Sequence, residues 1–333
     1  MAPTPQKILL IRFSSIGDIV LTTPVIRALH QQLGAEVHLL TKQSFAGVLV
    51  ANPYLHTIWR IRDKVNEVLP DLRAQGFTAI IDLHHNLRSW QVRWGLRGIP
   101  SYHFDKLNWQ KFLLTRWKIN RMPAVHIVDR YLAAAAPLGI HNDGLGLDHF
   151  IPPADVVAPA DFGLSGPFVA LVIGAAHATK RLPPDKLVAI CRGIALPVVL
   201  LGGPDEKDAG DQIVTAAGAH VYNLCGRTRL HQSADLLRHS SCVITHDTGL
   251  MHIAAALRKP ILSVWGNTVP AFGMYPYLPG HESRNTSFEV KGLSCRPCSK
   301  IGYQQCPRGH FRCMEQQDIP AILAGVKAAI KEN

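Results

Sequence analysis

Two acidic residues, Asp18 and Asp247, each lie shortly after an apolar run. This position makes them candidate catalytic or binding residues. Asp18 ends the string SSIGD, which follows the apolar run KILLIRF and precedes an amphipathic stretch that stops at Gly34. Ligands bind at the carboxyl ends of strands in open α/β sheets, so this loop is a candidate site. A carboxylate there could act as a general base or could simply cap the helix, since Asp is a favoured N-cap residue. The residue types leave both interpretations open.

The second acidic residue stands in the string CVITHDTGLMHIAAAL, where Asp247, Thr248 and Gly249 follow a predicted strand and open a predicted helix. Free backbone N–H groups and the helix dipole suit such a start to an anion, for example a diphosphate. Gly249 has no Cβ to block a close approach. Leu250 follows it, and His252 lies one turn further along the helix. Ordinary capping and turn chemistry is the alternative.

Other predicted strand ends in this half of the chain also carry polar residues or glycine. The string AHATKR supplies Lys180 and Arg181, GGPDEKD supplies Asp205 and Glu206, and Gly226 follows VYNLC. Taken together, these loops predict a pocket for a nucleoside diphosphate. No GxGxxG string follows a strand, which argues against an NAD-dependent enzyme.

These loops need a scaffold that aligns several strand ends, and the pattern of the chain predicts one. The 333 residues are 47% hydrophobic and 18% charged, an ordinary globular balance. Strand-like and helix-like runs alternate throughout, which predicts an α/β fold of two Rossmann-like domains whose parallel sheets face a central cleft. We expect an N-terminal domain at 1–150, a linker with four prolines at 151–167, a second domain at 168–315 and a C-terminal helix at 316–333.

Composition narrows the cellular setting. The seven cysteines are too sparse for a disulfide scaffold. No apolar run approaches the roughly 18 residues of a membrane span, and the first residues show no signal-peptide pattern. We therefore expect a cytoplasmic protein.

The positive charge is concentrated in one segment. Of the 35 Lys and Arg residues, eight fall within residues 87–121, together with four of the six Trp and a single acid. Such a stretch suits an anionic acceptor and an anionic membrane surface, although a solvated basic face with inward-packed Trp is the alternative. No nucleic-acid-binding motif accompanies the charge, so no nucleic-acid partner is expected. His84 and Arg88, near a predicted strand end, are the candidate acceptor contacts.

A cysteine cluster closes the sequence. Four cysteines form the pattern C-x2-C-x7-C-x6-C at Cys295, Cys298, Cys306 and Cys313. Four thiolates at such spacing could hold a structural zinc ion. A labile dithiol and plain reduced cysteines are the alternatives, and the spacing does not decide among them. Cys191, Cys225 and Cys242 fall on predicted helices or strands and are interpreted as core residues.

Several strings together resemble a known family. KILLIRFSSIGDIVLTTPVIRALH, HATKRLP, GGPDE, HDTGLMHIAAAL, PILSVWGNTVP and the cysteine-rich tail are similar to the ADP-heptose:lipopolysaccharide heptosyltransferases, glycosyltransferase family 9. The similarity runs along nearly the whole chain in the same order. It implies a GT-B fold and inverting transfer of a heptose from ADP-heptose to a hydroxyl of the lipopolysaccharide inner core.

The resemblance also implies roles for individual residues. The family's catalytic acid matches Asp18 and its donor-site lysine matches Lys180. A ribose-contacting acid matches Glu206 most closely, and the remaining donor-site group matches Asp247, Thr248, Gly249 and Leu250, with His252 behind them. The resemblance implies no metal and no cofactor, with ADP-heptose acting as substrate, at the cytoplasmic face of the inner membrane. Two alternatives stay open, namely a GT-B transferase with another nucleotide sugar and a non-catalytic binding module for nucleotide sugars or anionic glycans.

Overall fold

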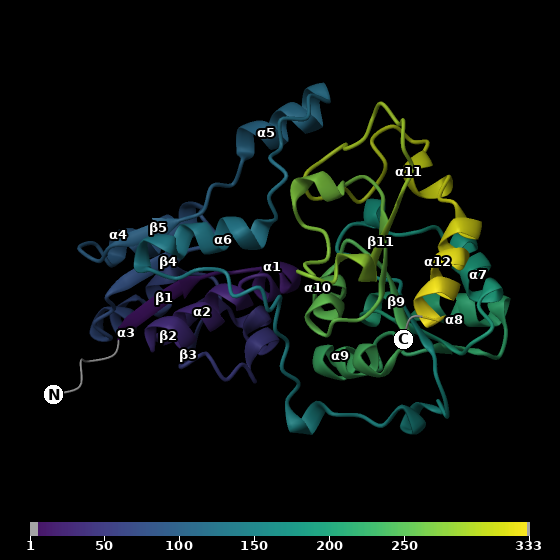
Figure 1. Cartoon of the computed structure of the whole chain (residues 1–333), viewed down its shortest axis with the longest axis horizontal. Coiled ribbons are helices and arrows are strands. Elements are labelled where there is room, and N and C mark those ends of the chain that lie inside the picture. The colour runs from purple at the N-terminus through teal and green to yellow at the C-terminus, as the bar shows by residue number, and fades with distance from the viewer. Residues whose placement is uncertain (1–5, 332–333) are drawn as a thin grey trace. The chain divides into compact units, whose positions relative to one another are not determined.

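The protein is described by a computed structural model covering residues 6–331. Residues 1–5 and 332–333 lie outside the described residues. The expectation of no signal peptide concerns residues 1–5, and the expected C-terminal helix includes residues 332–333. The chain forms two compact units (Figure 1). The first holds the chain up to Lys106 together with Val125–Phe150, and the second holds Leu107–Ala124 together with the chain from Ile151 onward. Residues 107–124 thus pack within the second unit, although their sequence position falls inside the expected first domain.

The first unit is built on a parallel sheet with the strand order β3-β2-β1-β4-β5. Its central strand is fully buried over Ile8–Ile11, as expected for an apolar run covered on both faces. In the register, Ile11 lies beside both Leu40 and Asp82, so the carboxyl ends of three strands meet. The strands are β1 (Lys7–Ile11), β2 (Glu36–Lys42), β3 (Thr57–Ile61), β4 (Ala79–Asp82) and β5 (Ser101–His103).

The helices of the first unit are shorter than the sequence pattern predicts. The amphipathic stretch after SSIGD is two helices, because Pro24 lies in the first turn of the second one, where its missing N–H is tolerated. Gly34, with φ of 61°, ends that second helix as expected. The helices are α1 (Ile16–Val20), α2 (Thr23–Leu33), α3 (Leu69–Ala74), α4 (Leu87–Gly95) and α6 (Ile127–Ala135).

The second unit has a larger parallel sheet, with the order β11-β10-β9-β6-β7-β8. Its outer strand β11 falls where the sequence predicts irregular structure after Gly266, because this half-exposed strand lacks the apolar character of a buried strand. The strands are β6 (Val169–Val172), β7 (Val198–Leu201), β8 (Val221–Asn223), β9 (Cys242–His246), β10 (Ile261–Trp265) and β11 (Asn285–Glu289). The α/β class with two parallel sheets is therefore confirmed.

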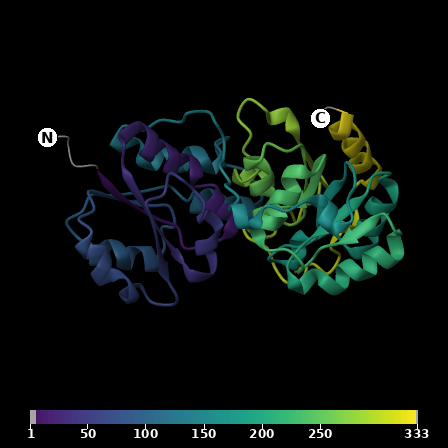
Figure 2. The same ribbon diagram turned by 90° about the horizontal axis from the view of Figure 1, so that it is seen from below.

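Helices cover both faces of this second sheet (Figures 1 and 2). The expected linker holds only two short 3-10 turns, Pro153–Asp155 and Pro159–Phe162. No helix among residues 6–331 combines the length and hydropathy needed to cross a bilayer. The helices of this unit are α5 (Asn108–Phe112), α7 (Pro184–Gly193), α8 (Lys207–Ala217), α9 (Leu230–His239), α10 (Gly249–Ala256), α11 (Arg312–Glu315) and α12 (Ile319–Lys331).

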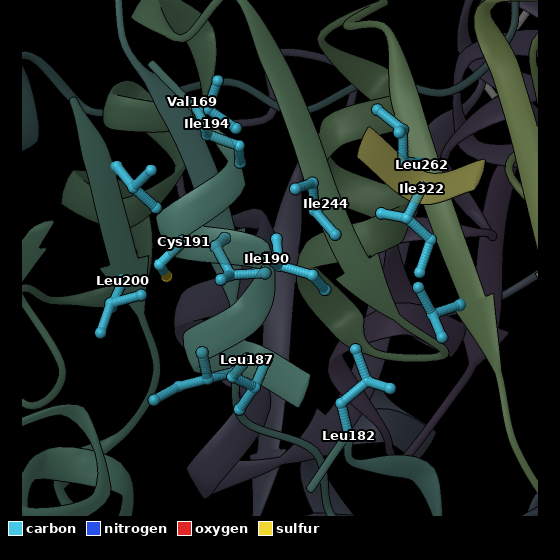
Figure 3. Packing of buried hydrophobic residues seen from close by; sticks show 14 of the residues in the cluster. Val169, Leu182, Leu187, Ile190, Cys191, Ile194, Leu200, Ile244, Leu262 and Ile322 are labelled. Atoms are coloured by element: carbon cyan, nitrogen blue, oxygen red, sulfur yellow. The ribbon is translucent and has the colours of Figure 1, made fainter. Parts of the chain in front are cut away.

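One hydrophobic core of the second unit lies between this sheet and the helices on one of its faces. Figure 3 shows Ile190 and Leu187 of α7 directed toward the strands, beside Ile244 of β9 and near Ile322 of α12. Ile190, Cys191 and Ile322 have no exposed surface. The three cysteines interpreted as core residues, Cys191, Cys225 and Cys242, are all buried. This packing fixes the strands whose carboxyl ends carry the candidate donor residues.

Candidate active site

Asp18 lies in the loop and short helix that follow the central strand of the first unit. It occupies the third position of α1, and Ser15 is the N-cap residue. The Ser15 hydroxyl donates to Asp18 Oδ2 over 2.8 Å, and the Ser15 backbone N–H donates to the same oxygen over 3.1 Å. Asp18 is thus part of a capping box rather than the N-cap itself. Asp18 is therefore not the N-cap residue, although it contributes to capping from the third position of the helix, and its other carboxylate oxygen, Oδ1, is engaged elsewhere.

That second oxygen pairs with Arg12, which the sequence analysis did not single out. Arg12 Nη2 lies 2.6 Å from Asp18 Oδ1, and the arginine side chain is only 10% exposed. The same guanidinium donates to the carbonyl of Ser14 over 2.8 Å and to the Tyr131 hydroxyl over 2.9 Å. Burial works against the positive charge, but the facing Asp18 carboxylate raises the pKa of Arg12 above its usual value. The sequence feature that could have identified Arg12 is its position as a charged residue near the end of the apolar run KILLIRF.

His84 and Arg88 lie against the same strand end, because both contact the buried ring of Phe13. The rings of His84 and Phe13 meet edge-on with centroids 5.2 Å apart. The Arg88 guanidinium carbon lies 5.8 Å from the Phe13 centroid, a cation–π distance. Burial, followed by the charge of Arg12, lowers the pKa of His84 to about 4. His84 is therefore a neutral imidazole at neutral pH, placed near the Arg12–Asp18 pair.

A shallow pocket of about 450 Å³ opens beside these residues on α4, lined by His85, Asn86, Leu87, Trp90 and Arg93. Arg93 Nε lies 3.3 Å from a carboxylate oxygen of the buried Asp82. The other Asp82 oxygen accepts the backbone N–H of His85 over 2.6 Å. This pocket therefore combines a cation, an imidazole and an aromatic ring, groups that suit an anionic sugar.

In the second unit, Lys180 and Asp247 come together from two different strand ends. Lys180 Nζ lies 2.6 Å from Asp247 Oδ2, and each side chain is about one-seventh exposed (15% and 14%). Thr268, after β10, donates its hydroxyl to the same oxygen over 3.0 Å. The Asp247 carboxylate thus balances the ammonium charge of Lys180. The sequence pattern did not identify Thr268, because its partner Asp247 lies 21 residues earlier in the chain.

Glu206 occupies a tight position between the ends of β6 and β7. One carboxylate oxygen accepts the backbone N–H of Gly203 over 2.8 Å, and the other pairs with Arg181 over 3.1 Å. A Cβ atom at Gly174 would come within 2.9 Å of the carboxylate. The sequence left Asp205 and Glu206 side by side as candidates. The structure places Glu206, which is buried, in this position.

The remaining candidate donor residues lie at the start of α10. Thr248 is the N-cap, and its hydroxyl accepts the N–H of Met251 over 3.4 Å. Gly249 and Leu250 are partly exposed in the first turn, as a helix start open to a ligand requires. His252, by contrast, is 2% exposed and lies inside the helix packing. The predicted helix start at Gly249 is confirmed, and His252 lies beneath it.

The cysteine-rich tail braces the loops that carry Lys180 and Thr268. The backbone N–H of Tyr303 donates to the Thr179 hydroxyl over 2.8 Å, and the N–H of Cys298 donates to the carbonyl of Asn267 over 3.1 Å. All the cysteines are free thiols. Burial raises the pKa of Cys298 to about 11, so this thiol is protonated at neutral pH. The tail thus has a structural role in the second unit.

Among residues 6–331, a single group of three potential metal ligands has its ligand atoms within 4.8 Å of one another, namely Glu36, His38 and His56. The cysteine cluster does not form such a group in this structure. The Trp59 indole donates to His38 Nδ1 over 3.1 Å, so the neutral ring carries its proton on Nε2. Lys7 Nζ also lies 3.6 Å from the Glu36 carboxylate. Glu36, His38 and His56 therefore fit a metal cation poorly, because His38 offers no free nitrogen lone pair and Glu36 already pairs with Lys7.

The tryptophans of the basic segment point outward rather than inward. Trp90 and Trp94 on α4 are 48% and 61% exposed, and Trp109 and Trp117 are 63% and 59% exposed. The alternative of a basic face with inward-packed Trp is therefore wrong. The two pairs belong to different units, because residues 107–124 pack with the second one.

Residues 66–304 match the family model described as glycosyltransferase family 9 (heptosyltransferase). The chain is 26% identical to lipopolysaccharide heptosyltransferase 3 of Escherichia coli K12 over 292 residues, which cover 77% of this chain and 81% of that protein.

Two solved structures have the same fold. A glycosyl transferase family 9 protein from Veillonella parvula DSM 2008 aligns with a TM-score of 0.79 at 20% identity, covering 98% of both chains. The E. coli ADP-heptose lps heptosyltransferase II aligns with a TM-score of 0.71 at 20% identity, covering 98% of this chain and 99% of that one.

Proposed function

Because this chain belongs to glycosyltransferase family 9, the heptosyltransferases, we propose that it transfers the heptose of ADP-heptose to a hydroxyl of the lipopolysaccharide inner core. The observation that carries the proposal is the Asp18 carboxylate, held by Arg12 and Ser15 at the carboxyl end of the central strand. The similarity to a lipopolysaccharide heptosyltransferase and to an ADP-heptose lps heptosyltransferase supports lipopolysaccharide as the acceptor class and ADP-heptose as the donor.

Asp18 acts as the general base in this proposal. An inverting displacement forms the new bond on the face opposite the departing diphosphate, and a carboxylate must take the acceptor proton as that bond forms. Three contacts restrict the rotation of Asp18, two from the hydroxyl and the backbone N–H of Ser15 and one from the guanidinium of Arg12. A fixed carboxylate loses little entropy on reaching the transition state. Asp18 is also 18% exposed at its side chain, which leaves room for an acceptor hydroxyl.

The second unit holds the donor. The N-terminus of α10 at Thr248 and Gly249 offers backbone N–H groups to the diphosphate. Lys180, which pairs with Asp247, supplies the positive charge for the leaving group in place of a metal ion. Glu206, fixed by Gly203 and Arg181, presents carboxylate oxygens suited to ribose hydroxyls. ADP-heptose is the substrate, and the reaction needs no cofactor.

The acceptor is held by the first unit. His84 and Arg88 lie against Phe13, close to the Arg12–Asp18 pair. Arg93 in the neighbouring pocket supplies a cation for the phosphates or carboxylates of an inner-core sugar. The acceptor reaches the protein at the cytoplasmic face of the inner membrane, with which the protein makes peripheral contact. Nucleic acid is not a partner.

Calorimetric titration with ADP, UDP, GDP and NADH tests the donor assignment. We expect preferential ADP binding, and a Lys180→Ala variant should bind ADP at least about tenfold more weakly, because a charge-assisted contact is worth about 1.5–3 kcal/mol. Lys186→Ala removes a lysine of the same unit whose ion pair is on the surface, and is the matched control. Preference for UDP or GDP would overturn the heptose donor, and binding of NADH alone would overturn the transferase.

A transfer assay tests the acceptor assignment. The full chain is incubated with ADP-heptose and with inner-core acceptors that differ in their terminal sugar, and the mass of the product is measured by mass spectrometry. We expect one acceptor to gain the mass of a single heptose. Binding of ADP without transfer to any core acceptor would exclude the lipopolysaccharide assignment.

A further inference from the structure

The donor and acceptor sites do not include the segment Leu107–Ala124. It runs through α5 and continues without a break into a π-helical turn, Leu113–Trp117. Figure 1 shows α5 at the periphery of its unit, away from the labelled strands β9 and β11. Its inward anchors are Leu107 and Leu114, each 7% exposed.

The outward side of this segment is aromatic. Trp109, Phe112 and Trp117 are 63%, 45% and 59% exposed. Their rings touch in sequence, with centroids 5.7 Å apart between Trp109 and Phe112 and 6.0 Å apart between Phe112 and Trp117. Ile119 beyond them is 44% exposed. Soluble proteins seldom expose several large apolar side chains side by side, so such a patch indicates a binding surface.

The charge of the segment identifies the occupant. Residues 107–124 contain four basic side chains, Lys111, Arg116, Lys118 and Arg121, and no acidic one. A second copy of this basic segment would repel it. Trp with Lys or Arg on one amphipathic element is the composition of segments that lie in the interface of anionic bilayers, where the rings reach the headgroup level and the cations meet lipid phosphates.

The segment is also tied to the donor unit, as an anchor must be. Lys118 ends the helical turn in the left-handed region and donates to the carbonyl of Pro297 in the cysteine-rich tail over 2.7 Å. That tail in turn contacts the loop of Lys180 through Thr179 and Tyr303. Hydrogen bonds thus connect the segment that carries the aromatic patch to the cysteine-rich tail, and the tail to the loop of Lys180.

We propose that Trp109, Phe112 and Trp117 insert into the interfacial region of an anionic membrane, with Arg116 and Arg121 binding lipid phosphates. The inference rests on the proposed function, in which the protein works at a bilayer. It specifies which surface of the protein contacts that bilayer. Its vesicle-binding tests use neither donor nor acceptor, so its failure and that of the proposed function are distinguishable.

The first experiment is co-sedimentation of the full chain with vesicles of phosphatidylcholine alone and with vesicles that also contain about 30% phosphatidylglycerol, an anionic lipid that gives the vesicle a negative surface potential. We expect strong binding only to the anionic vesicles. The variant Trp109→Ser/Phe112→Ser/Trp117→Ser should lose at least about tenfold in partitioning, because the buried apolar area is lost. Unchanged partitioning of this variant would overturn the proposal.

Charge is tested separately with a matched pair of variants. Arg116→Glu/Arg121→Glu should bind anionic vesicles at least about tenfold more weakly, since each basic residue near such a surface contributes about fivefold. Lys327→Glu/Lys331→Glu makes the same change in net charge on exposed positions of α12 and should bind as the unchanged chain does. Equal losses in both variants would show general electrostatic attraction, and this would overturn the assigned surface.

Insertion and folding have their own measurements. Brominated lipid should quench the tryptophan fluorescence of the unchanged chain and should not quench the triple variant, although Trp90 and Trp94 remain in it. A thermal melt checks that the triple variant is folded, as expected for changes at exposed positions. If the patch instead mediated self-association, sedimentation velocity without vesicles would show an oligomer that the triple variant abolishes, and the proposal would be wrong.

The transfer assay separates this inference from the proposed function. With a water-soluble, deacylated core acceptor the triple variant should transfer heptose at the unchanged rate, and with an acceptor embedded in vesicles it should be at least about tenfold slower. A chain that binds vesicles through the patch but transfers no heptose would refute the proposed function and retain the membrane surface.

Discussion

Replacing Asp18 by Asn removes one charge and tests the proposed base directly. Asn retains an oxygen that can accept from Ser15, so the capping geometry of α1 is preserved. The ionic contact of 2.6 Å to Arg12 becomes a neutral one. The guanidinium still donates to the carbonyl of Ser14 and to the hydroxyl of Tyr131. Because those partners remain, we expect a loss in unfolding free energy of about 1–3 kcal/mol rather than unfolding.

The effect on turnover should be much larger than the effect on folding. A positioned general base contributes about 10²–10⁴-fold to a rate, so kcat should fall by that factor in Asp18→Asn. ADP binding should stay within twofold, because all the proposed donor contacts lie in the second unit. Asp63→Asn changes an exposed acid of the first unit and is the matched control for charge.

Three measurements on the same preparation decide the outcome. Single-turnover transfer with ADP-heptose reports the chemical step, calorimetry reports the affinity for ADP, and a thermal melt reports folding. If Asp18→Asn keeps more than about a tenth of the rate while remaining folded, Asp18 is not the base. If ADP affinity falls in parallel with the rate, the assignment of donor contacts to the second unit is wrong.

Three further outcomes follow from the second unit. Gly174→Ala, whose Cβ would lie 2.9 Å from the Glu206 carboxylate, should lower ADP affinity about tenfold with little loss of stability, as calorimetry and a melt can show together. Gly226→Ala places a Cβ at a φ of 70° and 2.9 Å from a backbone atom of the loop after β7, so chemical denaturation should show a loss of about 1–3 kcal/mol. Burial and the nearby Arg181 charge lower the pKa of His246 to about 4. The unfolded chain therefore binds the extra proton between about pH 6.5 and 4, and stability falls as pH drops through that range by up to about 1.4 kcal/mol per pH unit. Denaturation of His246→Gln at several pH values should show a shallower slope, and an unchanged slope would contradict the account.

Much of the fold could be predicted because its signals are local. Apolar runs such as KILLIRF mark buried parallel strands wherever they occur. Their alternation with helices predicted the two parallel-sheet units. The cysteines assigned to the core and the start of α10 were also predicted correctly. The strings around Asp18 and Asp247 identified the family, and the match over residues 66–304 confirms it.

Element boundaries were less predictable, and so was the edge of the second sheet. Pro24 divides one amphipathic pattern into two helices. Strand β11 is half exposed and lacks a buried periodicity, so only its parallel pairing with β10 reveals it. The segment 107–124 packs outside the unit that surrounds it in sequence, and no local pattern specifies such a partner.

The candidate site also has a part that the sequence predicts and a part that only the tertiary structure shows. Sequence by itself determined which loops lie at the carboxyl edges of the two sheets, because acids and glycines that follow buried parallel strands are placed at that edge. Only the tertiary structure decided the partners: Arg12 with Asp18, Thr268 with Asp247, and Glu206 rather than Asp205 beside Arg181. It also decided that the aromatic rings of residues 107–124 face outward. These contacts join residues that are distant along the chain or on different elements, and their geometry depends on how whole layers pack rather than on any local propensity.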